Sequence, residues 1–256
     1  MSTDTTMTAA TKPYGSRAQA VVGTFELHVF VGPLAPDADT VRRFREACAA
    51  HGPAAGESDR SRRLKGLLLG LDYQQHGFVE VMQTSRYIRG SLADAWREIQ
   101  CDATALRRAG FDVLREKVEA VASNDHVPAH TDDVGRIPLD GYEHPYFEFH
   151  LRVIRAGAAP DLDHDDKVTL RALAAQLAQI HDRLIPLSYN ADKPDRWFLN
   201  ARTYGLGRSE SYELVQALAD AVAATDTLRV DKVIREYIVG DSHRALDQGW
   251  LEPLPA

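Results

Sequence analysis

Apolar and polar residues alternate along residues 21–31, and this period of two is typical of a β-strand. Glu26 and His28 would share one face of that strand, and the apolar side chains would share the other. Apolar positions in residues 37–50 recur at helical spacing, which predicts a helix. Similar patterns predict strands at 63–72, 77–87 and 111–121 and a helix at 91–109. The predicted order of this half is β-α-β-β-α-β.

The same order of elements returns in the second half of the chain. Strands are predicted at 146–154, 184–189, 196–204 and 228–239, and helices at 161–183 and 209–224. Phe147-Glu148-Phe149-His150-Leu151 corresponds to Phe25-Glu26-Leu27-His28-Val29 at an offset of 122. Ser85-Arg86 and Glu119 correspond more weakly to Ala201-Arg202 and Glu236, at offsets of 116 and 117. Matches that recur in order at a nearly constant offset indicate an internal duplication.

Composition also indicates the boundaries of the two repeats, because stretches of small and polar residues lie outside the segments with a strand or helix pattern. Residues near the start are small and Thr-rich, and a central stretch is rich in Asp, His, Gly and Pro. We therefore expect a disordered tail (1–20), a first repeat (21–122), a linker (123–145), a second repeat (146–240) and a C-terminal tail (241–256).

A β-α-β-β-α-β unit is a ferredoxin-like unit, and its two right-handed crossovers give the sheet order 4-1-3-2 with both helices on one face. The chain resembles uncharacterised bacterial, mainly actinobacterial, proteins with two such repeats in tandem. They share a strand with Glu-x-His, a strand ending in Arg, a last strand with Glu, and a tail matched here by Asp241-Ser242-His243 and Asp247-Gln248-Gly249-Trp250. This resemblance covers most of residues 21–252 and implies the α+β fold without implying a chemistry.

The duplication also makes the architecture similar to that of the dimeric α+β barrel superfamily. The resemblance implies that the two antiparallel sheets pack as a pseudo-twofold α+β barrel, with the helices outside and the polar strand faces inside. Isolated ionisable groups cost several kcal/mol each to bury unless they are paired or bound to a ligand. An enclosed polar face of this kind is therefore a candidate site.

Charge and apolar content exclude several partners. Lys and Arg number 30 against 37 for Asp and Glu, so the net charge is −7, which argues against nucleic acid and anionic lipid as partners. No apolar run approaches the ~20 residues that span a bilayer. Two cysteines support neither a disulfide framework nor a zinc knuckle. We expect a cytoplasmic monomer or homodimer with no nucleic-acid or membrane partner.

The candidate catalytic residues are the acidic and imidazole side chains on the polar strand faces: Glu26, His28, Glu148, His150, Glu119 and Glu236. One interpretation is acid–base catalysis, in which a glutamate raises the basicity of the histidine and fixes its tautomer. A second is that Glu26, His28, Glu148 and His150 hold a divalent zinc, manganese, iron or nickel ion. The third is a solvated strand face without a function.

The candidate substrate-binding residues are Arg86, Arg202, Lys117, Asn200 and Tyr204. Arg86 and Arg202 are expected either to pair with Glu119 and Glu236 or to bind a carboxylate or phosphate of the substrate. Arg115 is expected to face solvent.

The sequence lacks the serine-hydrolase, P-loop, dinucleotide-binding and kinase motifs. We therefore predict a small-molecule enzyme, a lyase, isomerase, cyclase or hydrolase, acting on an anionic substrate between the repeats. The Ala- and Arg-rich composition is compatible with a role in specialised biosynthesis. The alternatives are a non-catalytic small-ligand binding or carrier protein that uses the same cavity, and a structural module whose sheet face is a protein interface.

Overall fold

The computed structural model describes residues 21–51, 63–74, 76–134, 145–157 and 161–253. The first half contains β1 (Val22–Val31), α1 (Ala38–His51), β2 (Lys65–Tyr73), β3 (Gly77–Ser91), α2 (Leu92–Arg108) and β4 (Val113–Val121). The second half contains β5 (Tyr146–Arg155), α3 (His164–His181), β6 (Leu187–Asn190), β7 (Lys193–Tyr204), α4 (Arg208–Ala223) and β8 (Leu228–Asp241). The predicted β-α-β-β-α-β order is confirmed in both halves.

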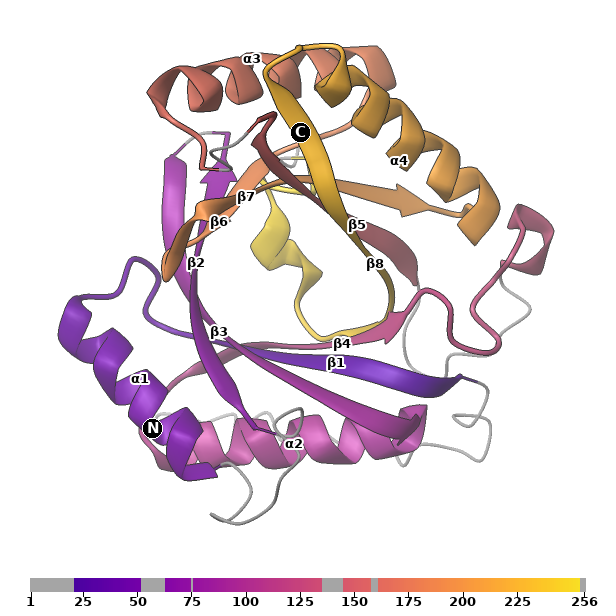
Figure 1. Ribbon diagram of the computed structural model, residues 1–256. Coiled ribbons are helices and arrows are strands. Elements are labelled where there is room, and N and C mark those ends of the chain that lie inside the picture. Colours follow the sequence, from indigo (N-terminus) through magenta and orange to yellow (C-terminus); the bar gives the residue numbers. More distant parts are fainter. Residues whose placement is uncertain (1–20, 52–62, 75, 135–144, 158–160, 254–256) are drawn as a thin grey trace, which may run out of the picture.

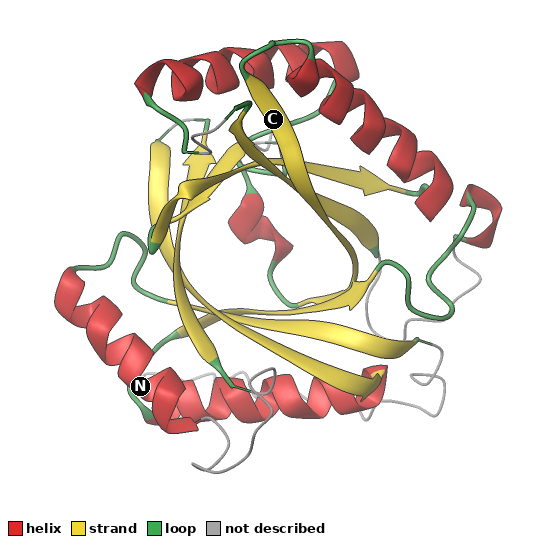
Figure 2. Cartoon of the chain, in the orientation of Figure 1, coloured by secondary structure: helices red, strands yellow, loops and turns green. Residues whose placement is uncertain are grey.

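All eight strands belong to one closed antiparallel sheet, in the order β1-β3-β2-β6-β7-β5-β8-β4 (Figure 1). Each half has the predicted 4-1-3-2 order. The expectation of two separate packed sheets is corrected, because the halves join edge to edge through the pairs β2·β6 and β4·β8. The backbone groups at both sheet edges of each half are thereby hydrogen-bonded, because each edge strand pairs with its counterpart in the other half. The long helices lie outside the ring (Figure 2).

The hydrophobic core lies between the outer face of this sheet and the helices. Phe25 and Leu27 of β1 and Phe147 and Phe149 of β5 are fully buried there, on the face opposite the Glu-x-His pairs. Helices α2 and α3 begin at capping boxes built on Ser91 and Asp163, as expected for such residues at a helix start. The alternation of the strands thus directs their polar side chains into the ring.

The chain after β8 runs into the interior of the ring, where Figure 1 shows it in yellow. A short 3-10 helix spans Arg244–Asp247, and Trp250 packs inside the sheet against Leu71, Val81 and Leu251. None of the helices in the described ranges is long and apolar enough to cross a membrane.

Candidate functional site

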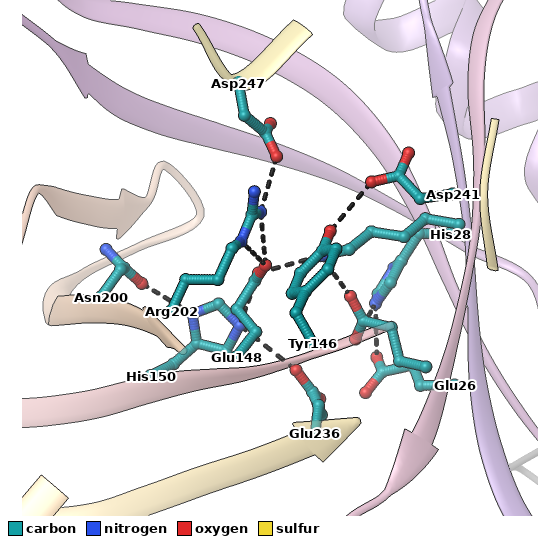
Figure 3. Close-up of polar contacts among 12 residues, drawn as sticks. Glu26, His28, Tyr146, Glu148, His150, Asn200, Arg202, Glu236, Asp241 and Asp247 are labelled. Atoms are coloured by element: carbon teal, nitrogen blue, oxygen red, sulfur yellow. Dashed lines mark hydrogen bonds and ion pairs between the residues drawn. The ribbon is translucent and has the colours of Figure 1, made fainter. Parts of the chain in front are cut away.

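The inward side chains form two Glu–His–Glu groups at equivalent positions of the two halves. We call the first centre the group Glu26, His28 and Glu119, and the second centre the group Glu148, His150 and Glu236. In the ladders, Glu26 lies opposite Glu119 and Glu148 lies opposite Glu236, so each centre combines neighbouring strands. Figure 3 shows Glu26 and His28 facing the residues of the second centre across the interior. All six side chains come from the predicted polar faces.

His28 holds the first centre together. Its Nδ1 lies 2.6 Å from the carbonyl oxygen of Thr84, and its Nε2 lies 3.1 Å from Glu119 Oε2 and 3.7 Å from Glu26 Oε1. The side-chain amide of Gln83 lies farther from Nδ1, at 2.9 Å. Because the nearer carbonyl oxygen can only accept, Nδ1 carries a proton and Nε2 faces the carboxylates. Burial by itself lowers the pKa of His28, but the charges of Glu119 and Glu26 raise it to about 9.

The first centre could also hold a metal ion. One ligand atom from each of Glu26, His28 and Glu119 lies within 4.8 Å of the others, and all three residues are buried. The predicted ligand set is thus corrected: Glu119 joins Glu26 and His28, whereas Glu148 and His150 do not belong to this group. Imidazole nitrogen and carboxylate oxygen suit zinc, manganese, iron and nickel.

The second centre repeats the orientation of the first. His150 Nδ1 lies 2.6 Å from Asn200 Oδ1, and its Nε2 lies 3.2 Å from Glu236 Oε2 and 3.4 Å from Glu148 Oε1. Burial by itself lowers the pKa of His150, but the short contact with Glu236, its charge and the charge of Glu148 raise it to about 9. Asn200, a predicted substrate-binding residue, is fully buried; it contacts this imidazole and is not among the residues that line the cavity described below.

Glu236 is a buried carboxyl group of the second centre with an incomplete set of hydrogen bonds. Its Oε2 makes no hydrogen bond with the described residues, although His150 Nε2 is 3.2 Å away. Burial and the nearby charge of Glu119 raise the pKa of Glu236 to about 8. Glu236 and His150 form one coupled pair, which keeps its protons at neutral pH and releases one on the alkaline side.

Lys117 connects the two centres. Its Nζ lies 2.7 Å from Glu119 Oε1 and 2.9 Å from Glu148 Oε1. Burial raises the pKa of the Glu148 carboxyl, but the charges of Lys117 and Arg202 outweigh it and lower that pKa to about 2. Lys117, a predicted substrate-binding residue, therefore lies inside the ring and binds one carboxylate from each half.

Arg202 also faces inward, where three carboxylates surround its guanidinium group. Its Nη2 lies 2.6 Å from Glu148 Oε2 and 2.6 Å from Asp247 Oδ2, and its Nη1 lies 2.7 Å from Glu252 Oε1. The predicted partner Glu236 is not among these contacts. Tyr204 lies at the same end of the ring, 41% exposed and bonded to Arg202 and Glu252.

Arg115, predicted to face solvent, is instead 1% exposed. Its guanidinium binds Asp241 through Nε at 2.8 Å and Asp247 through Nη1 at 2.7 Å, and Tyr146 donates to Asp241 at 2.9 Å. Alternate residues of a strand share a face, so the spacing of Arg115, Lys117 and Glu119 along β4 already indicates that Arg115 points inward with the other two. Asp247 lies in the tail, where the sequence pattern gives no signal for a pairing with Arg115.

Arg86 is a further correction, because it lies outside the ring. Its Nη2 lies 2.9 Å from Glu98 Oε2 and 3.0 Å from Asp102 Oδ2, both on α2. In the ladders Arg86 pairs with Leu27, whereas Arg202 pairs with Glu148. The repeat offset between β3 and β7 is therefore one residue less than the 116 read from the sequence, and a slip of one residue moves a side chain to the other face.

A cavity of about 180 Å³ lies between the two centres. Its polar wall includes all six glutamates and histidines together with Lys117. Its apolar wall is formed by Phe30, Leu67, Leu69, Leu71, Phe198, Ile234 and Trp250. Arg202 and Tyr204 do not line it, so Lys117 is the one predicted anion-binding residue that does so in the described part of the chain.

Comparison with known proteins identifies no family for the chain, since neither a family model nor a curated protein sequence matches it. One solved structure, from Fusobacterium nucleatum subsp. nucleatum ATCC 25586 and described as a "Putative monooxygenase", covers 92% of this chain and 99% of its own at 10% identity, with a TM-score of 0.31. At that identity and score the similarity supports no conclusion about activity.

Proposed function

We propose that the chain is a small-molecule enzyme that transfers protons in the interior cavity. The observation that carries this proposal is Glu236, a buried carboxyl group in the cavity wall with one oxygen free of hydrogen bonds. Its pKa of about 8 lies near neutral pH, where a general acid or base works best. Together with His150, Glu236 would donate a proton to the substrate or remove one from it.

The cavity walls support a small substrate with one polar and one apolar part. At roughly 30 Å³ per water-sized group, 180 Å³ holds about six such groups. An ammonium group has three N–H donors, and two of those on Lys117 are directed at Glu119 and Glu148. The third would bind an anionic group of the substrate. Lyase, isomerase, cyclase and hydrolase reactions all include a proton transfer of this kind.

The test screens small carboxylic acids with acidic C–H bonds as substrates. Each is incubated with the protein in D2O, and proton NMR follows deuterium exchange and product formation. We expect exchange or turnover of at least one compound, with a loss of about 100-fold or more in Glu236→Gln. The control is Glu213→Gln on the exposed surface of α4, which should match the wild type.

Two results would contradict the proposal. Equal rates in wild type and Glu236→Gln would exclude Glu236 as the proton-transfer group. Binding of a compound by calorimetry, with no exchange or turnover, would identify the cavity as that of a carrier protein instead.

A further inference from the structure

We infer that the first centre binds one divalent transition-metal ion and that the second centre, despite its identical residue types, binds none. The ligand atoms of Glu26, His28 and Glu119 already converge within 4.8 Å. They project from β1 and β4, which are paired neighbours in the closed sheet, so the backbone fixes their spacing. This inference goes beyond the proposed function and holds whether or not Glu236 transfers protons.

The imidazole of His28 is oriented as a metal ligand would be. Metal-binding histidines characteristically donate their second N–H to a carbonyl or carboxylate oxygen, which fixes the tautomer and the ring. Thr84 supplies that carbonyl at 2.6 Å from Nδ1. Nε2 therefore faces Glu26 and Glu119 and can bind a cation between them.

Both carboxylates of the first centre are positioned by donors of their own. Ser85 Oγ donates to Glu26 Oε1 at 2.6 Å, and Lys117 Nζ donates to Glu119 Oε1 at 2.7 Å. Lys117 occupies the oxygen of Glu119 that faces away from His28, because His28 Nε2 lies at Oε2. The ammonium can thus stay in place while Oε2 binds the ion.

The second centre serves as an internal comparison, because positively charged side chains already neutralise its Glu148. Glu148 accepts from Arg202 at Oε2 and contacts Lys117 at Oε1, so cations occupy both of its oxygens. Within the described residues, its three side chains do not form a convergent group like that of the first centre. The counterpart of Arg202 in the first half is Tyr87, which brings no positive charge to Glu26, and this difference leaves one metal site per chain.

A separate observation indicates that the cavity takes a ligand. Glu236 Oε2 is buried and lines the same cavity, and it has a contact with His150 Nε2 at 3.2 Å but no hydrogen bond with the described residues. Buried polar atoms in native proteins are nearly always satisfied, so a donor is expected to enter the cavity. Water bound to an ion in the first centre is such a donor, since three protein ligands leave coordination positions free.

The donor set restricts the choice of ion. One imidazole and two carboxylates favour zinc, manganese, iron or nickel over ions that prefer thiolates. Zn²⁺ and Mn²⁺ are the two probes for the test. The chelator-treated full chain is titrated with each ion by calorimetry, and bound metal is counted by elemental analysis after gel filtration.

We expect one equivalent of Zn²⁺ or Mn²⁺ in the wild type. His28→Gln and Glu26→Gln should weaken binding by about 100-fold or more, since each removes a ligand. His150→Gln, the matched change in the second centre, should bind with an affinity within about threefold of the wild type. No binding of either ion, a second equivalent that His150→Gln removes, or unchanged affinity in His28→Gln would each overturn the inference.

A measurement on the wild type covers variants that fail to fold. In a chain labelled with 15N-histidine, Zn²⁺ should shift the ring Nε2 resonance of His28 and leave His150 near its metal-free position. A shift of His150 alone, or of no histidine, would contradict the assignment. Metal binding is measured without substrate, so its failure would leave the exchange assay on Glu236 unaffected, and the two proposals fail separately.

Discussion

The pKa of Glu236 is raised because burial and a neighbouring carboxylate act in the same direction. Its pKa is about 8 in the folded chain, against 4.5 for an ordinary glutamate. Folding therefore takes up a proton, and the stabilising contribution is complete below pH 4.5. It is lost as pH rises toward 8, at about 1.4 kcal/mol per unit of pKa difference.

The first prediction concerns Glu236→Gln, which imitates the neutral carboxyl group. The free energy of unfolding of the wild type should fall by several kcal/mol between pH 5 and pH 8, and this variant should show a flatter profile. Urea denaturation at five pH values measures it, with Glu213→Gln as the exposed control. Parallel profiles for wild type and Glu236→Gln would refute the assigned ionisation state.

Arg202 is placed where its loss would take one cationic partner from each of two buried carboxylates. The change Arg202→Gln leaves Glu148 with Lys117 alone and Asp247 with Arg115 alone. Breaking a buried pair by removing one partner costs about 3–5 kcal/mol. We expect a loss of unfolding free energy of that size in denaturant titrations, and a loss below about 1 kcal/mol for the exposed control Arg229→Gln.

At the scale of single elements, β3 presents Arg86 to α2. Asp102 is fully buried, and its Oδ2 has Arg86 as its cationic partner at 3.0 Å. Arg86→Met should therefore cost about 2 kcal/mol of stability by leaving Asp102 with His51 alone. Zinc affinity and deuterium exchange should stay at wild-type values, since Arg86 faces away from the cavity. A loss of metal affinity without loss of stability would contradict this placement.

The elements show where sequence reasoning succeeds. Alternation placed Glu26, His28, Glu148 and His150 on inward faces, because one apolar face of a strand must meet the core. The strand order followed from right-handed crossovers. All six glutamates and histidines of the two centres, Glu119 and Glu236 included, could therefore be found from local pattern alone.

The sequence pattern did not give the correct placement or partners at two kinds of position. Ser85-Arg86 and Ala201-Arg202 look equivalent in sequence, but only the ladder register shows that Tyr87 is the counterpart of Arg202. The partners of Arg115, at Asp241 and Asp247, lie 126 and 132 residues away along the chain. No local periodicity reports pairings at such separations.

For the whole molecule, closure depends on two seams between the halves, β2·β6 and β4·β8. A chain of residues 21–134 would expose both edges of its sheet, which are templates for pairing with another strand. Because each edge pairs with its own counterpart, two copies of the first half could close a similar ring. We expect this fragment to be dimeric or aggregated in light scattering after gel filtration; a stable monomer would show that the seams are dispensable.

Lys117 shows what one continuous chain allows that two identical copies would not. It lies opposite His28 on β4, and the counterpart position opposite His150 is Ile234. Two identical subunits would place either two ammonium groups near the twofold axis or none. Covalent linkage of two unequal halves permits a single ammonium group between the centres, bound to one glutamate from each half, so the two sides of the chamber differ in charge although they carry the same Glu–His–Glu residues.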